Sequence, residues 1–189
     1  LYRAEVVTES IRGTEDPETV QFSFSSEQPV ERYFGQEVLS HQPGAMNMER
    51  LNSGAAPWLW NHNPDVVLGV VERAWQGADG RGRVQTRWSP NTKEVGTEEY
   101  KRRQDWEAGI NRNVSFMYSI DAPVDTQSRE GVALVTAFTP MEVSAVSIPA
   151  DHTVGQGRAI PANVDPCSTI DTAAVSTAPT PTPNSMESP

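Results

Sequence analysis

Residues 57–88 read PWLWNHNPDVVLGVVERAWQGADGRGRVQTRW, and this stretch decides the fold. Its apolar residues fall into three short runs, at 57–60, 66–75 and 84–88. The first two runs are separated by Asn63-Pro64-Asp65 and the last two by the glycine-rich segment 78–82, both of which are typical turn sequences. Short apolar runs between turns indicate β-strands, so the stretch predicts three consecutive strands, the last two forming a hairpin.

On either side of this stretch, the pattern predicts more strands and one long helix. Apolar residues indicate strands near 20–24, 30–39, 113–120, 132–138 and 142–148. Residues 92–109 predict the helix, because Ser89-Pro90-Asn91-Thr92 offers a cap and a proline near its start and Gly109 follows its end. We therefore expect an α+β fold built on a mostly antiparallel, closed β-barrel that is flanked by helices.

Composition divides the chain into two parts. Residues 1–160 carry the predicted strands and helix and form the expected folded domain. Residues 161–189 are rich in Thr and Pro and contain no Lys, Arg or aromatic residue. Such a segment cannot bury enough apolar surface to offset its conformational entropy, so we expect a disordered linker or tail there.

Charge and cysteine content exclude several classes of protein. The formal net charge of −10 argues against nucleic acid and against an anionic membrane surface as partners. The single cysteine, Cys167, excludes an intramolecular disulfide and a cysteine-rich zinc site. The first residues show no secretory signal, which favours a cytoplasmic location. A peptide or protein partner is compatible with all of this.

Two residues in this pattern are candidates for proton transfer and nucleophilic attack. His62 follows the apolar strand and precedes a turn, and the ordinary histidine pKa of about 6.5 suits proton transfer at neutral pH. Ser115 lies in a bulky strand after the helix and would be a nucleophile if a histidine lay within hydrogen-bond reach. A histidine that only caps its strand and an ordinary strand serine are the plain alternatives. Ser144 is a rival nucleophile.

A carboxylate near His62 would orient the imidazole and stabilise its cationic form. Glu142 is the candidate, and Asp65, Asp151 and His152 are rivals for the same role. His62, Asp65 and His152 also offer the donor types that bind zinc or iron. The His62–Asp65 spacing crosses a proline turn, so we expect no metal.

Five blocks, in this order, resemble the prohead protease family of tailed bacteriophages, which is related to the herpesvirus assemblin proteases. The blocks are Phe34–Leu39, the apolar strand ending at His62, Leu68-Gly69-Val70-Val71, Arg112-Asn113-Val114-Ser115 and Glu142–Ala150. The resemblance implies the herpesvirus-protease-like barrel, with His62 as general base, Ser115 as nucleophile and Glu142 as third member. Arg112 and Arg158 are candidates for oxyanion donors, and no cofactor is required.

The resemblance also implies a function and a setting. We expect a serine endopeptidase that cleaves scaffold and capsid-protein extensions, and itself, inside the immature procapsid in the host cytoplasm. The major capsid protein and scaffold segments would be its substrates, and a homodimer is one arrangement that the related herpesvirus enzymes suggest. The alternative is a catalytically inactive relative that acts as an internal scaffold for capsid assembly. If the chain is a protease, the segment 161–189 would suit self-cleavage, and it could equally join the domain to a fused scaffold or capsid protein.

Overall fold

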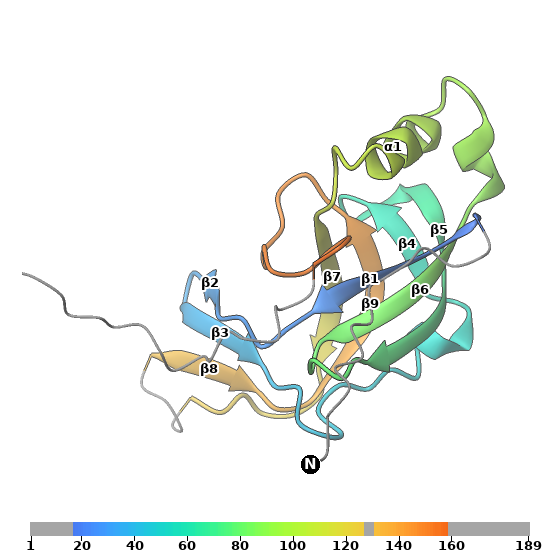
Figure 1. Cartoon of the computed structure of the whole chain (residues 1–189). Helices are drawn as coiled ribbons and strands as arrows, with labels where there is room; N and C mark the ends of the chain where they lie inside the picture. The colour runs from blue at the N-terminus through green and yellow to red at the C-terminus, as the bar shows by residue number, and fades with distance from the viewer. Residues whose placement is uncertain (1–16, 127–130, 159–189) are drawn as a thin grey trace, which may run out of the picture. The chain divides into compact units, whose positions relative to one another are not determined.

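The computed structural model describes residues 17–126 and 131–158 (Figure 1). Its strands are β1 (Thr19–Ser25), β2 (Val30–Arg32), β3 (Gly35–Leu39), β4 (Pro57–Trp60), β5 (Asn63–Gln76), β6 (Gly82–Trp88), β7 (Val114–Ile120), β8 (Val132–Val135) and β9 (Phe138–Ala145). The helices are α1 (Glu98–Glu107) and the short 3-10 turns η1 (Leu51–Ser53) and η2 (Pro90–Lys93). Within these ranges, no helix is long and apolar enough to cross a membrane.

The strands form two sheets, of which the larger has the order β1-β6-β5-β4-β9-β7. The predicted hairpin is the pair β5–β6, which turns over Gly77–Arg81. Most pairs in this sheet are antiparallel, but β4 and β9 run parallel. The smaller sheet has the order β2-β3-β8, in which β3 and β8 are parallel.

The larger sheet curls without closing, which differs from the expected closed barrel (Figure 1). Its outer strands, β1 and β7, are not hydrogen-bonded neighbours in the sheet. Instead Gly155 forms bridges to Ser23 at β1 and to Asn113 just before β7. In the described residues, this short piece of chain therefore bridges β1 and the start of β7 through Gly155.

Aromatic side chains fill the interior of the curled sheet. Phe22, Trp58 and Trp106 are at most 1% exposed, and Trp88 is 2% exposed. The rings of Trp58 and Trp88 have centroids 4.1 Å apart, and Trp106 from α1 lies 5.3 Å from Trp58. Each such side chain contributes roughly 1.5–3 kcal/mol by leaving water. The tryptophan on α1 thus attaches the helix to the sheet.

Gly69 in β5 allows Trp58 to pack flat on its neighbouring strand. The two residues are paired across β4 and β5. A Cβ atom at Gly69 would lie 2.0 Å from the carbonyl oxygen of Arg87 and 3.3 Å from the Trp58 ring. The glycine is therefore required by close approach of three strands rather than by a turn.

The helical segment is shorter than the predicted span 92–109. Gly96 has a φ angle of 99°, which is unsuited to a helix and separates η2 from α1. Helix α1 starts after Thr97, whose hydroxyl accepts a hydrogen bond from the Tyr100 N–H at 3.1 Å. Gly109, with a φ angle of 69°, follows its end. The capping residue is thus Thr97, not the Ser89–Thr92 segment, which caps η2 instead.

Other predictions concern residues that the structure does not describe. The expected linker or tail at 161–189 lies outside the described ranges. The domain boundary near 160 therefore stays a prediction.

The predicted strand 30–39 is two strands, β2 and β3, because the chain turns at Tyr33-Phe34.

Candidate functional site: a cavity beside His62 and Ser115

The chain reverses between β4 and β5 over Asn61 and His62, and Trp60 pairs with Asn63 across the turn. The two loop residues have φ angles of 50° and 59°, which are uncommon outside glycine. Two-residue hairpin loops favour such angles because their twist matches that of the flanking strands. The Asn61 N–H donates to the Ala145 carbonyl at 2.9 Å, which fixes the loop to β9. This contact sets the position of the His62 ring.

Glu142 on β9 contacts the Nδ1 side of the His62 ring. Its Oε1 atom lies 2.7 Å from His62 Nδ1 and accepts the Met117 N–H at 2.9 Å. Its Oε2 atom accepts the Ser144 hydroxyl at 2.6 Å. Glu142 is only 5% exposed, so these donors replace the water that the carboxylate loses on burial. Since the carboxylate accepts, Nδ1 carries the hydrogen and Nε2 is the acceptor nitrogen of the neutral ring.

Ser115 lies on β7, directly opposite Ser144 on β9. It lines a cavity of about 400 Å³ together with His62. We call this space the His62–Ser115 cavity. Within the described ranges, no hydrogen bond joins the Ser115 hydroxyl to the His62 ring. The Ser144 hydroxyl accepts the backbone N–H of His62 at 3.1 Å. The fold therefore brings the two predicted residues to one cavity without pairing them.

The rivals for the third position lie elsewhere. Asp65 and His152 are exposed, and the carboxylate of Asp151 accepts hydrogen bonds from Ser26 and Thr153. Only Glu142, among the four residues considered, contacts His62. Sequence spacing could not show this, because the contact depends on β4 and β9 being parallel neighbours.

The metal and oxyanion alternatives find no support in the geometry. Among residues 17–126 and 131–158, no three His, Cys, Asp or Glu side chains are grouped as metal ligands. Arg112 donates from Nε to the Gly109 carbonyl at 3.1 Å, and Arg158 donates to Asn113 Oδ1 at 2.9 Å. Neither arginine lines the His62–Ser115 cavity.

The cavity lining includes a polar trio, Arg32, Glu37 and Tyr118, that joins the two sheets. Arg32 on β2 donates from Nε to Glu37 Oε1 at 3.0 Å, and the Tyr118 hydroxyl on β7 donates to the same oxygen. Arg32 also donates to the Tyr118 oxygen at 3.2 Å. Burial, followed by the hydrogen bond to Glu37, raises the pKa of Tyr118 to about 12. The Tyr118 hydroxyl thus keeps its proton at neutral pH.

Ser25, which lines the cavity, is hydrogen-bonded to His41, and the sequence analysis did not predict this serine–histidine pair. Ser25 Oγ is 2.9 Å from His41 Nε2, and His41 Nδ1 is 3.1 Å from the Leu39 carbonyl. A carbonyl can only accept, so Nδ1 carries the hydrogen and the Ser25 hydroxyl donates to Nε2. Burial lowers the pKa of His41, which is 6% exposed. The sequence around His41 contains no recognisable catalytic motif, so sequence analysis gave no reason to select this pair.

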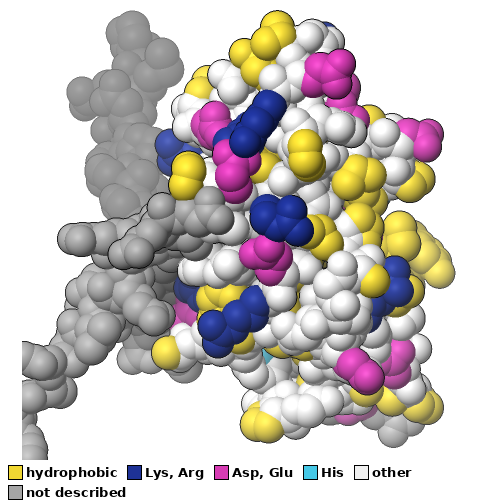
Figure 2. Space-filling model, turned by 90° about the vertical axis from the view of Figure 1, so that its right-hand side faces the viewer, with side chains coloured by type: hydrophobic (Ala, Val, Ile, Leu, Met, Phe, Trp, Pro, Cys, Tyr) yellow, Lys and Arg dark blue, Asp and Glu magenta, His cyan; other side chains and the backbone are white. Residues whose placement is uncertain are grey.

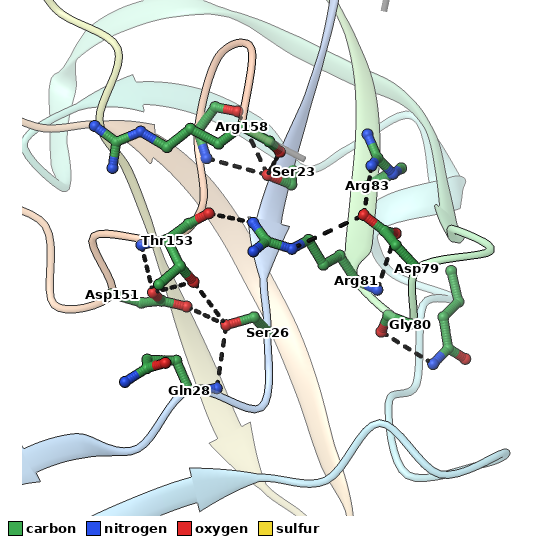
Figure 3. Close-up of polar contacts among 12 residues, drawn as sticks. Ser23, Ser26, Gln28, Asp79, Gly80, Arg81, Arg83, Asp151, Thr153 and Arg158 are labelled. Atoms are coloured by element: carbon green, nitrogen blue, oxygen red, sulfur yellow. Dashed lines mark hydrogen bonds and ion pairs between the residues drawn. The ribbon is translucent and has the colours of Figure 1, made fainter. Parts of the chain in front are cut away.

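The remaining wall of the cavity is the segment that precedes Arg158, shown in Figure 3. Asp151 accepts from Thr153 N at 2.7 Å and from the Ser26 hydroxyl, which ties this segment to the end of β1. Arg81 donates to the Thr153 carbonyl, and Arg83 donates to Asp79 at 2.7 Å (Figure 3). The Arg81 bond connects the segment to the β5–β6 hairpin, and the Arg83–Asp79 bond lies within the hairpin itself.

Comparison with known proteins gives one informative likeness. The chain is 44% identical over 142 residues to the major capsid protein of Halomonas phage phiHAP-1. The match covers 72% of this chain but only 22% of that protein, so the chain spans about a fifth of the relative's length. No family model matches the chain. No solved structure matches it either.

The likeness contradicts the expected enzyme. The relative is named as a major capsid protein, which is a structural protein, and nothing found supports a protease family. The assignment as a serine endopeptidase and hydrolase is therefore wrong, and the likeness points to a structural capsid role instead. The link to phage capsids is confirmed in its coarser form. His62, Ser115 and Glu142 remain a predicted site, without the endopeptidase roles, and the herpesvirus-protease-like barrel stays a prediction.

Proposed function

We propose that this chain is part of a phage capsid protein and that its described domain serves capsid structure by associating with other capsid polypeptides. The observation that carries the proposal is the 44% identity over 142 residues to a phage major capsid protein. Identity at this level over that length supports a shared fold and a shared setting. The matched length is 22% of the relative, so the proposal concerns one segment of a capsid subunit.

The described surface is compatible with protein contacts. Figure 2 shows acidic and basic side chains interspersed with hydrophobic ones on one face of the molecule. Tyr33 is fully exposed and Phe34 is 52% exposed, and the rings touch at the tip of the β2–β3 turn with centroids 5.0 Å apart. Exposed aromatic residues are common at protein interfaces. The net charge of −10 disfavours direct contact with packaged nucleic acid.

The proposal places the chain in the capsid or its precursor, with assembly in the host cytoplasm. Capsid polypeptides become partners, whereas their expected role as substrates is withdrawn with the enzyme. The homodimer suggested by the sequence resemblance stays a prediction. The proposal therefore depends on whether the chain is incorporated into capsid particles.

Mass spectrometry of particles tests this. Procapsids and mature capsids are purified from cells infected with the phage that encodes the chain, and tryptic peptides from residues 17–158 are quantified against peptides of the remaining capsid polypeptide. We expect the two sets at similar copy number in procapsids. If peptides from 17–158 are absent from particles at both stages, the chain is not a capsid segment.

A matched pair of variants tests whether the folded domain is needed for capsid assembly or is only carried along in the particle. Gly69→Ala places a Cβ 2.0 Å from the Arg87 carbonyl oxygen, whereas a Cβ at Gly54 meets nothing within 4 Å. We expect Gly69→Ala to lower the yield of particles and Gly54→Ala to leave it near the wild-type level. Equal yields from both variants would show that the folded domain is dispensable for assembly.

A further inference from the structure

Residues 151–158 form a strap that contacts both β1 and the residues just before β7 without joining the sheet as a strand. Two backbone hydrogen bonds attach it to other described residues. The Gly155 N–H donates to the Ser23 carbonyl at 2.9 Å, and the Gln156 N–H donates to the Arg112 carbonyl at 3.0 Å. A strand of this length would form a continuous ladder instead, so the strap depends on side chains for much of its attachment.

Side chains hold the strap near both of its ends. Asp151 accepts the Ser26 hydroxyl, and Ser26 Oγ lies 3.2 Å from Thr153 Oγ1 (Figure 3). At the other end, Arg158 donates to Asn113 Oδ1 at 2.9 Å. All three contacts are only partly buried. Water therefore takes over these hydrogen bonds when the strap separates, which keeps the net cost of separation low.

The strap carries one apolar side chain, Val154, which is 1% exposed and lines the His62–Ser115 cavity. Val154 does not belong to the main core cluster, which is built around Phe22, Trp58 and Trp106. Separation of the strap would therefore leave that cluster packed. The strands of the larger sheet hold their positions through this cluster and through their own ladders, neither of which includes the strap.

A buried arginine in contact with the strap is incompletely paired. Arg81 is 6% exposed and donates from Nη1 to the Thr153 carbonyl. Within the described residues its buried Nε atom has no hydrogen-bond partner, and the Asp79 carboxylate lies 3.8 Å from it. Burial lowers the pKa of Arg81, because the charged guanidinium loses more by desolvation than Asp79 and Asp151 return. Water that reaches this group on separation of the strap offsets part of the cost of release.

We propose that residues 151–158 are a releasable strap, which separates from β1 and β7 as a unit while the larger sheet stays folded, and thereby opens one wall of the His62–Ser115 cavity. Asp151 and Val154 leave the cavity lining when the strap separates. Local opening is typical of segments with few buried apolar contacts. Such a strap would operate whether or not the domain is a capsid segment.

Hydrogen exchange of the full chain, followed by NMR at increasing low urea concentrations, tests this. After correction for intrinsic rates, we expect the Gly155 and Gln156 amides to exchange at least roughly tenfold faster than the Val71 amide, with a weaker dependence on urea. The Val71 N–H donates to the Ala56 carbonyl at 2.9 Å and Val71 is 0% exposed, so it reports global unfolding. Equal protection and equal urea dependence for all three amides would show that the strap opens only with the whole domain, and would overturn the proposal.

Two variants that each lose one hydroxyl separate the strap from the sheet. Ser26→Ala removes the bond to Asp151, and Thr97→Ala removes the cap of α1, which the opened state keeps. We expect Ser26→Ala to speed exchange of Gly155 by about fivefold. Thr97→Ala should speed exchange of Val71 by a similar factor and leave Gly155 unchanged. If Thr97→Ala accelerates Gly155 as much as Val71, no separate opening of the strap exists.

Thiol labelling reports the opening of the cavity wall itself. In a Cys167→Ser background, Val154→Cys places a buried thiol on the strap and Val84→Cys places one in β6, where Val84 is 0% exposed. Each labelling rate is referred to the global stability of the same variant, measured by urea denaturation. We expect Val154→Cys to react at least roughly tenfold faster than global unfolding allows, and Val84→Cys to react only through it. Equal protection of the two thiols would contradict the proposal.

Discussion

His62 and Glu142 are 80 positions apart in the sequence, and their Nδ1 and Oε1 atoms lie 2.7 Å apart. The contact exists because β4 and β9 are parallel neighbours and the His62 loop projects over β9. Glu142 also accepts from Met117 on β7 and from Ser144 on its own strand. One buried carboxylate thus joins three consecutive parts of the sheet, and its removal has predictable effects.

Replacing Glu142 with glutamine should destabilise the domain. The amide cannot accept all three donors, so at least one buried donor loses its partner, at a cost of about 1–3 kcal/mol. Urea denaturation measures this loss, with Glu49→Gln at an exposed position as the control. In NMR spectra, the hydrogen on His62 Nδ1 should lose its strong hydrogen-bonded shift. Unchanged stability of Glu142→Gln would show that the carboxylate does not anchor the sheet.

The stability of the domain should fall as the pH drops below about 6.5, the ordinary histidine value. Burial lowers the pKa of His41, so the unfolded chain binds a proton more readily than the folded one. Stability from this residue is complete above pH 6.5 and is lost as the pH falls toward its folded pKa, by up to about 1.4 kcal/mol per pH unit. The negative Glu27 and Asp151 oppose the shift without cancelling it.

Thermal unfolding at a series of pH values between about 5 and 7 checks this slope. The variant His41→Gln should show a flatter dependence, whereas His152→Gln, at an exposed position, should keep the wild-type slope. If stability depends on pH equally in the wild type and in His41→Gln, His41 is not the cause of the pH dependence.

Gly69→Ala should be among the most damaging small substitutions in the chain. Its Cβ would lie 2.0 Å from the Arg87 carbonyl oxygen, which belongs to backbone and cannot turn aside. We expect a loss of about 3 kcal/mol or more in unfolding free energy. Gly54→Ala has a positive φ of 76° but open space around it, and should cost about 1 kcal/mol. Equal losses for the two variants would exclude close packing as the cause.

Thr97→Ala should weaken the start of α1. The hydroxyl accepts the Tyr100 N–H at 3.1 Å, and loss of such a cap costs about 1 kcal/mol. Thr97→Ser keeps the hydroxyl and should restore most of the stability. Circular dichroism and chemical denaturation measure both variants. A serine variant as unstable as the alanine variant would assign the effect to the lost methyl group instead.

Much of the local structure could be predicted from the sequence. The apolar runs around Trp58, Val70 and Trp88 predicted strands that β4, β5 and β6 confirm, because strand formation depends on short-range alternation and turn residues. The helix was predicted with the wrong start, since Gly96 interrupts the segment and Thr97 supplies the cap. The strand predicted over 30–39 was divided by the turn at Tyr33-Phe34. Errors of this kind arise at the ends of helices and strands, where a single residue decides whether the element starts or stops.

The sequence by itself determined most of the strands, and it predicted the candidate residues His62, Ser115 and Glu142. Only the tertiary structure decided that Glu142 contacts His62, that Ser115 lines a cavity with His62 without a hydrogen bond to its ring, and that Ser25 in the cavity wall is hydrogen-bonded to His41. Strand order and parallel pairing join segments far apart in the chain, and no local pattern encodes that order. In the described residues β1 and β7 are not hydrogen-bonded neighbours, and residues of both strands line the cavity, which depends on the whole strand order.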